Sequence, residues 1–284
     1  MLFQGEIMDR KTSVDIEDRG YQFGDGIYEV IGVYNRKPML MDEHLERLQR
    51  SAQEIQLKLP VSVAKLKSNL LELISLNDLQ EGIIYLQVSR GVASRWHEFP
   101  SEDVPPVWLA YTREEKPMTY IEDHGATAVL TEDIRWLRCD IKTLNLLPNV
   151  LAKQKAVEHD AFEAILHRGK TVTEASSSNV FIVKNGEIFT HPANNYILNG
   201  ITRQRVLQLT EKLHVPVREQ PFTVSDLLNA DEVFVTATKL DIIPIIQVDN
   251  QMIGKGKPGV ITRQIIGQFR QDINRLVNEP HLHQ

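Results

Sequence analysis

Strand-like runs that come in groups, with helical repeats between them, constrain the fold of this chain most strongly. Residues 27–34 are rich in β-branched and aromatic side chains and predict a strand that ends in turn-forming residues. Leu45, Leu48 and Ala52 then recur at helical spacing, which predicts a helix from about Asp42. Grouped strands with intervening helices favour an α+β fold over strict alternation of strand and helix.

The rest of the chain continues this pattern. Asn185-Gly186 separates two apolar runs and predicts a tight hairpin turn. Further helices are expected at 63–76, 148–158, 202–213 and 260–277, and further strands at 83–89, 107–112, 126–131, 163–167, 179–183, 187–190, 233–236 and 242–248.

The length of 284 residues is large for one compact core, so we expect two domains or one large one. The polar stretch Glu114-Glu115-Lys116-Pro117 contains a proline and is the candidate boundary. The predicted division is a smaller N-terminal α/β domain at 1–115, a linker at 116–120 and a C-terminal domain at 121–284.

Charge and cysteine content limit the class of protein. The chain has 32 basic and 38 acidic residues, and its net charge of −6 argues against a nucleic-acid partner. The single Cys139 cannot form an intrachain disulfide, which indicates a reducing compartment. With no signal-peptide pattern and no apolar stretch of transmembrane length, we expect a cytoplasmic protein that has no membrane partner and no metal site.

Lys142 is the most informative single residue. It lies in the run Asp140-Ile141-Lys142-Thr143-Leu144, where apolar neighbours on both sides reduce the hydration of its amine. Loss of hydration favours the neutral amine, which is a nucleophile able to form a Schiff base with a carbonyl compound. The alternative is an ordinary lysine whose ammonium group reaches solvent from a half-buried segment.

A second candidate group is the run Thr173-Glu174-Ala175-Ser176-Ser177-Ser178, which directly precedes an apolar strand. A carboxylate fixed at the entrance of a strand can hold a ring nitrogen in its protonated form, the partner that the pyridine ring of pyridoxal phosphate requires. Glu174 is the candidate, and the alternative is a polar turn that caps the strand.

Three segments have residues suited to an anion. Gly200 and Thr202 open a predicted helix, whose N-terminal N–H groups can bind a phosphate, although they also suit a routine helix cap. Arg47 lies on the polar face of the first predicted helix; if it turns inward, its planar guanidinium can donate two hydrogen bonds to a phosphate, and the alternative is a solvated face. Thr238, at the end of a strand, is a weaker candidate.

The glycine-led loop Gly91 to Pro100 places Arg95 and His97 on either side of a tryptophan. Two such cations can bind the carboxylate of a small substrate. An exposed loop with unrelated charges is the alternative.

These segments occur in an order that resembles a known family. The run Glu17-Asp18-Arg19-Gly20-Tyr21-Gln22-Phe23-Gly24-Asp25-Gly26-Ile27-Tyr28-Glu29-Val30 resembles the N-terminal signature of the fold-type IV pyridoxal-phosphate enzymes. Stretches 132–147, 172–181 and 191–203 extend the similarity over nearly the whole chain, which is most similar to the D-amino acid aminotransferases. The resemblance implies an α+β fold of two domains, the smaller α/β and the larger β-barrel-like and cofactor-binding. It also implies pyridoxal 5′-phosphate as cofactor, and a homodimer.

The resemblance also implies a role for each candidate residue. Lys142 would form the Schiff base with the cofactor and act as the catalytic base, and Glu174 would pair with the pyridine nitrogen. Arg135 would support Glu174 or Tyr28. The remaining roles are phosphate binding for Arg47, Ile201, Thr202 and Thr238, cofactor lining for Ser176, Ser177 and Ser178, ring packing for Leu198, and binding of the substrate carboxylate for Tyr28 with Arg95 and His97 of the partner subunit.

The expected activity is transfer of the amino group of D-amino acids, such as D-alanine, to 2-oxo acids, such as 2-oxoglutarate. Aminodeoxychorismate lyase and L-branched-chain aminotransferase activities remain alternatives on the same fold. A domain without catalytic activity is a third alternative. Lys239 and Leu240, directly after Thr238, suggest an altered side-chain pocket.

Overall fold

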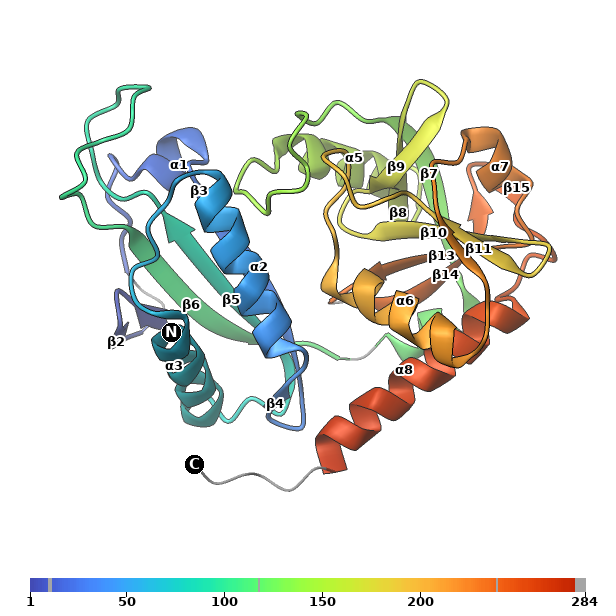
Figure 1. Cartoon of the computed structure of the whole chain (residues 1–284), viewed down its shortest axis with the longest axis horizontal. Coiled ribbons are helices and arrows are strands. Elements are labelled where there is room, and N and C mark those ends of the chain that lie inside the picture. The colour runs from blue at the N-terminus through green and yellow to red at the C-terminus, as the bar shows by residue number, and fades with distance from the viewer. Residues whose placement is uncertain (10–11, 117, 239, 279–284) are drawn as a thin grey trace. The chain divides into compact units, whose positions relative to one another are not determined.

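The computed structural model describes residues 1–9, 12–116, 118–238 and 240–278, so Lys239 lies outside the described residues. The chain forms two compact units (Figure 1). Of the described residues, the first unit comprises those in 1–116, Ile141–Asn145 and 276–278, and the second comprises those in 118–140 and Leu146–Arg275. The division into domains 1–115 and 121–284 stays a prediction, and Pro117 of the predicted linker is outside the described residues.

The first unit is a six-stranded sheet, ordered β2-β1-β6-β5-β3-β4, with helices α2 and α3 packed on one of its faces (Figure 1). Every neighbouring pair of strands is antiparallel. The elements are β1 (Leu2–Phe3), β2 (Glu6–Ile7), α1 (Arg19–Phe23), β3 (Gly26–Tyr34), β4 (Lys37–Pro38), α2 (Met41–Glu54), α3 (Val63–Leu76), β5 (Glu81–Ser89) and β6 (Val107–Glu114).

The core of this unit follows from the periodicity of its sequence. Leu45, Leu48 and Ala52 form the buried stripe of α2, as the helical spacing predicts. Ser62 begins α3 because its hydroxyl accepts a hydrogen bond from the Lys65 backbone N–H at 3.3 Å. The three strands predicted at 27–34, 83–89 and 107–112 and both predicted helices are therefore present.

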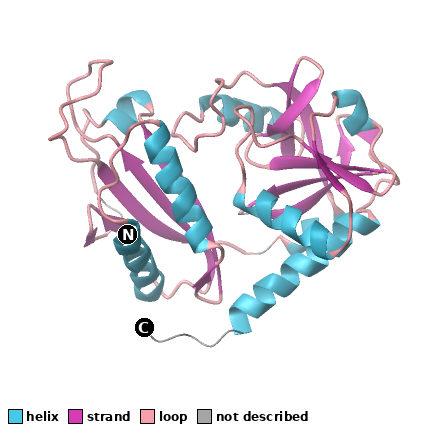
Figure 2. Cartoon of the chain, in the orientation of Figure 1, coloured by secondary structure: helices cyan, strands magenta, loops and turns pink. Residues whose placement is uncertain are grey.

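The second unit contains a nine-stranded mixed sheet, ordered β12-β11-β10-β13-β14-β7-β8-β9, with β15 paired to β14. Figure 2 shows the helices of this unit around the outside of its strands. The elements are α4 (Thr119–His124), β7 (Ala126–Glu132), α5 (Leu147–Glu158), β8 (Glu163–Arg168), β9 (Thr171–Ala175), β10 (Asn179–Lys184), β11 (Glu187–Thr190), α6 (Ile201–Lys212), β12 (Val217–Glu219), α7 (Val224–Leu228), β13 (Glu232–Ala237), β14 (Asp241–Val248), β15 (Gln251–Met252) and α8 (Val260–Asn278).

The predicted hairpin joins β10 and β11. Asn185 and Gly186 have φ angles of 51° and 79°, which Asn-Gly adopts readily in a two-residue hairpin turn. Strand β10 is buried along Val180–Val183 without alternation, because both of its faces are covered. Phe181 stacks on Phe234 of β13 with ring centroids 4.7 Å apart.

Two elements near the candidate residues were not expected from the sequence. The short helix α1 starts at Asp18, whose side chain accepts hydrogen bonds from the N–H groups of Gly20 and Tyr21. Strand β9 contains Glu174, so the polar run starts as a strand and only its serines form the turn into β10. Among the described residues, none of the helices combines the length and the apolar character needed to cross a lipid bilayer.

Candidate active site

Lys142 is held against strand β3 of the first unit. Its backbone oxygen accepts a hydrogen bond from Tyr28 N at 3.1 Å, and the next residue, Thr143, forms an isolated β-bridge with Ile27. The half-buried Lys142 side chain places Nζ 4.4 Å from the centre of the Tyr28 ring. The sequence prediction assigned Lys142 to the C-terminal domain, whereas its contacts place it with the first unit.

Arg47 of α2 forms a buried cluster with Glu29 of the same strand, β3. Its Nε and Nη2 each donate to a different Glu29 carboxylate oxygen at 2.8 Å, and His44 Nδ1 lies 2.7 Å from one of these oxygens. Burial acts to raise the pKa of Glu29, but the charge and hydrogen bonds of Arg47 outweigh it and lower that pKa to about 2. Burial lowers the pKa of His44, although Glu29 opposes this effect.

Arg95 and His97 are both exposed and both contact one ring, that of Phe23. Arg95 Cζ lies 4.9 Å from the centre of this ring, and the centre of the His97 imidazole lies 5.8 Å from it. Their loop is fastened by the buried Arg19, whose Nη1 donates to the Trp96 oxygen at 2.7 Å. The structure thus brings these two predicted residues together on one side of the loop.

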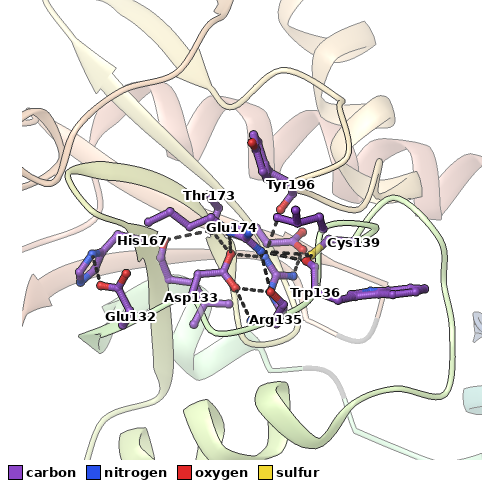
Figure 3. A network of polar contacts seen from close by, with 12 residues as sticks. Glu132, Asp133, Arg135, Trp136, Cys139, His167, Thr173, Glu174 and Tyr196 are labelled. Carbon is purple, nitrogen blue, oxygen red and sulfur yellow. Dashed lines mark hydrogen bonds and ion pairs between the residues drawn. The ribbon is translucent and has the colours of Figure 1, made fainter. Parts of the chain in front are cut away.

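Glu174 is the centre of a polar network in the second unit (Figure 3). One carboxylate oxygen accepts from Arg135 Nη1, and the other accepts from Asn179 Nδ2 at 3.0 Å and from Leu198 N at 3.1 Å. Burial raises the pKa of Glu174, and Arg135 opposes this rise. From the sequence, Arg135 is expected to support Glu174 or Tyr28. Arg135 contacts Glu174, which belongs to the same unit.

The three serines share one partner that the sequence did not indicate. The hydroxyls of Ser176, Ser177 and Ser178 all donate to the carboxylate of Glu163, which is fully buried at the start of β8. Their orientation is therefore fixed by a neighbouring strand. The sequence did contain a signal for this contact, because Glu163 begins an apolar strand. A carboxylate buried there requires several hydrogen-bond donors, which the three serines supply.

The start of α6 is built without a side-chain cap. The N-cap residue is Gly200, which has no side chain to accept a hydrogen bond from the first N–H groups of the helix. Ile201 and Thr202 are each 5% exposed. A Cβ on Gly200 would lie 2.2 Å from Asn179 Oδ1, so only glycine allows this approach. The helix begins one residue earlier than the predicted Thr202, and Thr238, after β13, is half-buried.

Thr236 adds a polar atom to this region. It lies opposite Asn179 in the register of β10 and β13, so the two side chains share a face of the sheet. The Thr236 hydroxyl is buried and has no hydrogen-bond partner among the described residues. An uncapped helix N-terminus near a buried hydroxyl is suited to a phosphate group.

Comparison with known proteins extends these observations. The family model described as amino-transferase class IV matches residues 26–248. The chain belongs to this family. It is 49% identical to the D-alanine aminotransferase of Staphylococcus haemolyticus over 96% of this chain and 97% of that protein. It is 50% identical to the D-alanine aminotransferase of Bacillus licheniformis over 93% of this chain and 94% of that protein.

Solved structures confirm the predicted α+β architecture of fold type IV. The branched-chain amino acid aminotransferase of Escherichia coli has a TM-score of 0.92 with 24% identity, covering 98% of this chain and 96% of that chain. The branched-chain aminotransferase of Thermoproteus uzoniensis, solved with norvaline, has a TM-score of 0.88 with 24% identity, covering 98% of this chain and 95% of that chain. A further branched-chain enzyme, complexed with N-(5′-phosphopyridoxyl)-L-glutamate, has a TM-score of 0.89 with 23% identity over the same shares of both chains.

The cofactor of this family is pyridoxal 5′-phosphate, and the residues of the second unit fit it. The uncapped start of α6 and the unpartnered Thr236 hydroxyl match the needs of a phosphate. The buried Glu174, fixed by three donors, matches the need of a protonated ring nitrogen. The predicted cofactor is therefore consistent with the donor set of this chain.

Proposed function

We propose that this chain is a pyridoxal-phosphate-dependent aminotransferase that transfers the amino group of D-amino acids, such as D-alanine, to 2-oxo acids, such as 2-oxoglutarate. The observation that carries this proposal is identity close to one half, over more than 90% of both chains, with D-alanine aminotransferases. The branched-chain enzymes of known structure support their own activity less, because at 23–24% identity they share the fold alone.

Lys142 and Glu174 would divide the acid-base chemistry between them. When bound, pyridoxal 5′-phosphate supplies an electron sink for the electrons released at the substrate Cα. Lys142 Nζ would hold the cofactor covalently at rest, and during turnover it would take the proton from the substrate Cα and deliver it to C4′, the former aldehyde carbon of the cofactor. The fixed carboxylate of Glu174 would keep the proton on the ring nitrogen.

Phosphate binding would use the backbone N–H groups of Ile201 and Thr202, the Thr202 and Thr238 hydroxyls, and Arg47. The positive end of α6 favours an anion at its N-terminus. Ser176, Ser177 and Ser178 would line the cofactor with hydroxyl groups whose directions Glu163 sets. Leu198 would pack on the ring. Its backbone N–H donates to Glu174 and its backbone oxygen accepts from Asn179, and these two bonds hold Leu198 beside the proposed partner of the ring nitrogen.

Tyr28, with Arg95 and His97 of the partner subunit, would bind the substrate α-carboxylate and so select the D enantiomer. The shared contact of Arg95 and His97 with Phe23 supports this role, since it sets the spacing of two donors before substrate arrives. Loss of either donor is expected to raise KM more than it lowers kcat.

A homodimer is part of this proposal. Within a single chain, Leu147, Val150 and Leu151 form an apolar face on α5 and are 53–69% exposed. Exposed apolar patches of this kind typically mark interfaces. Sedimentation that gives a monomer at micromolar concentration would contradict the dimer.

A cytoplasmic location is also proposed, because Cys139 is a free thiol.

The function is tested with a panel of D- and L-amino acids and 2-oxoglutarate as acceptor. Consumption of D-alanine with formation of pyruvate is expected. Exclusive consumption of L-leucine and L-valine would favour the branched-chain activity, and release of pyruvate from aminodeoxychorismate without an acceptor would favour the lyase. Purified protein without cofactor absorbance would favour a domain without catalytic activity.

Lys142→Ala provides the matching test of the residue. The variant is expected to lose turnover by several orders of magnitude and to bind the cofactor only noncovalently, because no amine remains to bond with the aldehyde. Borohydride reduction followed by peptide mapping should place the cofactor on Lys142 in the parent protein. An adduct on another side chain, or full transamination by the variant, would refute this role.

A further inference from the structure

Arg135 is shared between two buried carboxylates, as Figure 3 shows. Its Nη1 donates to Glu174, while Nε and Nη2 donate to the two oxygens of Asp133 at 2.9 Å each. The Arg135 and Glu174 side chains are each 7% exposed, and that of Asp133 is fully buried. One guanidinium therefore sets the position of the proposed ring partner, and Asp133 sets the position of the guanidinium.

Asp133 is itself fixed from three adjacent strands. It directly follows β7, its backbone N–H donates to the His167 oxygen of β8 at 2.8 Å, and its Oδ2 accepts from Thr173 Oγ1 of β9 at 2.9 Å. Arg168 Nε, at the end of β8, donates to the same oxygen at 3.1 Å. Asp133 is thus a rigid anchor, which a flexible surface carboxylate would not be.

The charges of the cluster determine how strongly Glu174 can attract a proton. Burial raises the pKa of Glu174, the charge of Arg135 lowers it, and the charge of Asp133 raises it again. Burial acts to raise the pKa of Asp133, but Arg135, Arg168 and Thr173 lower it to about 2, so Asp133 is ionised at neutral pH. Asp133 thereby offsets part of the positive charge that Arg135 exerts on Glu174.

We propose that Asp133 is a positioning residue for the cofactor ring, which holds Arg135 against Glu174 and offsets enough of its positive charge for Glu174 to bind a protonated ring nitrogen. The inference rests on the proposed function. It extends that function to a residue two positions before Arg135, whose side-chain contact with the network around Glu174 is made through the Arg135 guanidinium.

Asp133→Asn tests the proposal, because it removes the charge and keeps the shape. The holoenzyme is freed of cofactor, and the dissociation constants are measured for pyridoxal 5′-phosphate and for its deaza analogue, in which C–H replaces the ring nitrogen. We expect the variant to bind pyridoxal 5′-phosphate at least about tenfold more weakly, since one uncompensated charge within a few ångströms shifts a proton equilibrium by about one to three pH units. Affinity for the analogue should change less than about threefold, because it has no ring proton to lose.

Glu132→Gln is the matched control. It removes a negative charge from the neighbouring residue, but Glu132 is 59% exposed and faces His167 (Figure 3). Both affinities should remain those of the parent protein. Equal weakening of cofactor and analogue in Asp133→Asn would indicate a structural role only and overturn the proposal, and so would parental affinity for both.

Arg168→Gln covers the case in which Asp133→Asn fails to fold. It removes a cation that competes with Arg135 for Asp133, so the preference for the cofactor over its analogue should rise about twofold or stay unchanged. A fall in that preference would overturn the proposal. Failure of the parent protein to bind the cofactor at all would instead refute the proposed function, so the two failures are distinct.

Discussion

Glu29→Gln is expected to destabilise the first unit by about 3 kcal/mol at neutral pH. The Glu29 carboxylate is completely buried and accepts two hydrogen bonds from Arg47, which is 8% exposed. Glutamine retains one acceptor oxygen but leaves the Arg47 charge buried without its counter-ion. Glu29 lies on β3 and its carboxylate contacts His44 and Arg47 of α2, so the loss falls on the contact between the sheet and α2.

The magnitude follows from the pKa of Glu29. A fall from the ordinary value of 4.5 to about 2 corresponds to about 3 kcal/mol of folding free energy. Loss of one partner of a buried ion pair ordinarily costs about 3–5 kcal/mol, which agrees. Since the folded-state pKa lies below the unfolded-state value, this stabilisation is fully present above about pH 5 and is lost as the pH falls toward 2.

Urea unfolding, followed by the fluorescence of the buried Trp108 of the first unit, measures the effect. The difference between the parent protein and Glu29→Gln should be about 3 kcal/mol at pH 7 and roughly half of that at pH 3. Glu46→Gln is the control, because Glu46 is exposed on the same helix and should alter stability by less than about 0.5 kcal/mol. A difference below about 1 kcal/mol at pH 7, or one that does not depend on pH, would refute the reasoning.

Two further outcomes are expected. Gly200→Ala should weaken cofactor affinity by more than about tenfold, because its Cβ would displace Asn179, which donates to Glu174. Gly267→Ala, with open space around its Cβ, should leave affinity unchanged in the same equilibrium dialysis. Burial raises the pKa of the Cys139 thiol to about 11, so at pH 8 it should react with a disulfide reagent at least about 100-fold more slowly in the native protein than in urea. Equal rates would contradict its burial.

Local patterns predicted most of the elements correctly. The buried stripe of α2 and the Asn185-Gly186 hairpin depend on residues close together in sequence, so periodicity and turn chemistry sufficed. Strand β9 was not predicted because Thr171–Ala175 is short and leads into three serines, a composition typical of turns. Its strand character comes from pairing with β8.

The partners of the candidate residues depend on contacts that are distant in sequence. Glu29 meets Arg47 across 18 residues, and Glu174 meets Arg135 across 39. No local pattern specifies such pairs, which explains why Glu29, Asp133 and Glu163 were not recognised as candidates. Residue types with a distinctive local context, such as Lys142 between apolar neighbours, were accessible from the sequence alone. Their assigned roles stay predictions.

The five-residue segment Ile141–Asn145 makes the two units inseparable as pieces of chain. The polypeptide leaves the second unit after Asp140, contributes Lys142 to the first unit, and returns to the second at Leu146. A fragment ending at Lys116 would therefore lack Lys142 and also Thr143, the β-bridge partner of Ile27. A fragment starting after Lys116 would contain Lys142 without the strand β3 against which its segment lies. Expression of either half by itself, or exchange of halves between relatives at a single junction, would separate Lys142 from the strand β3 that holds its segment.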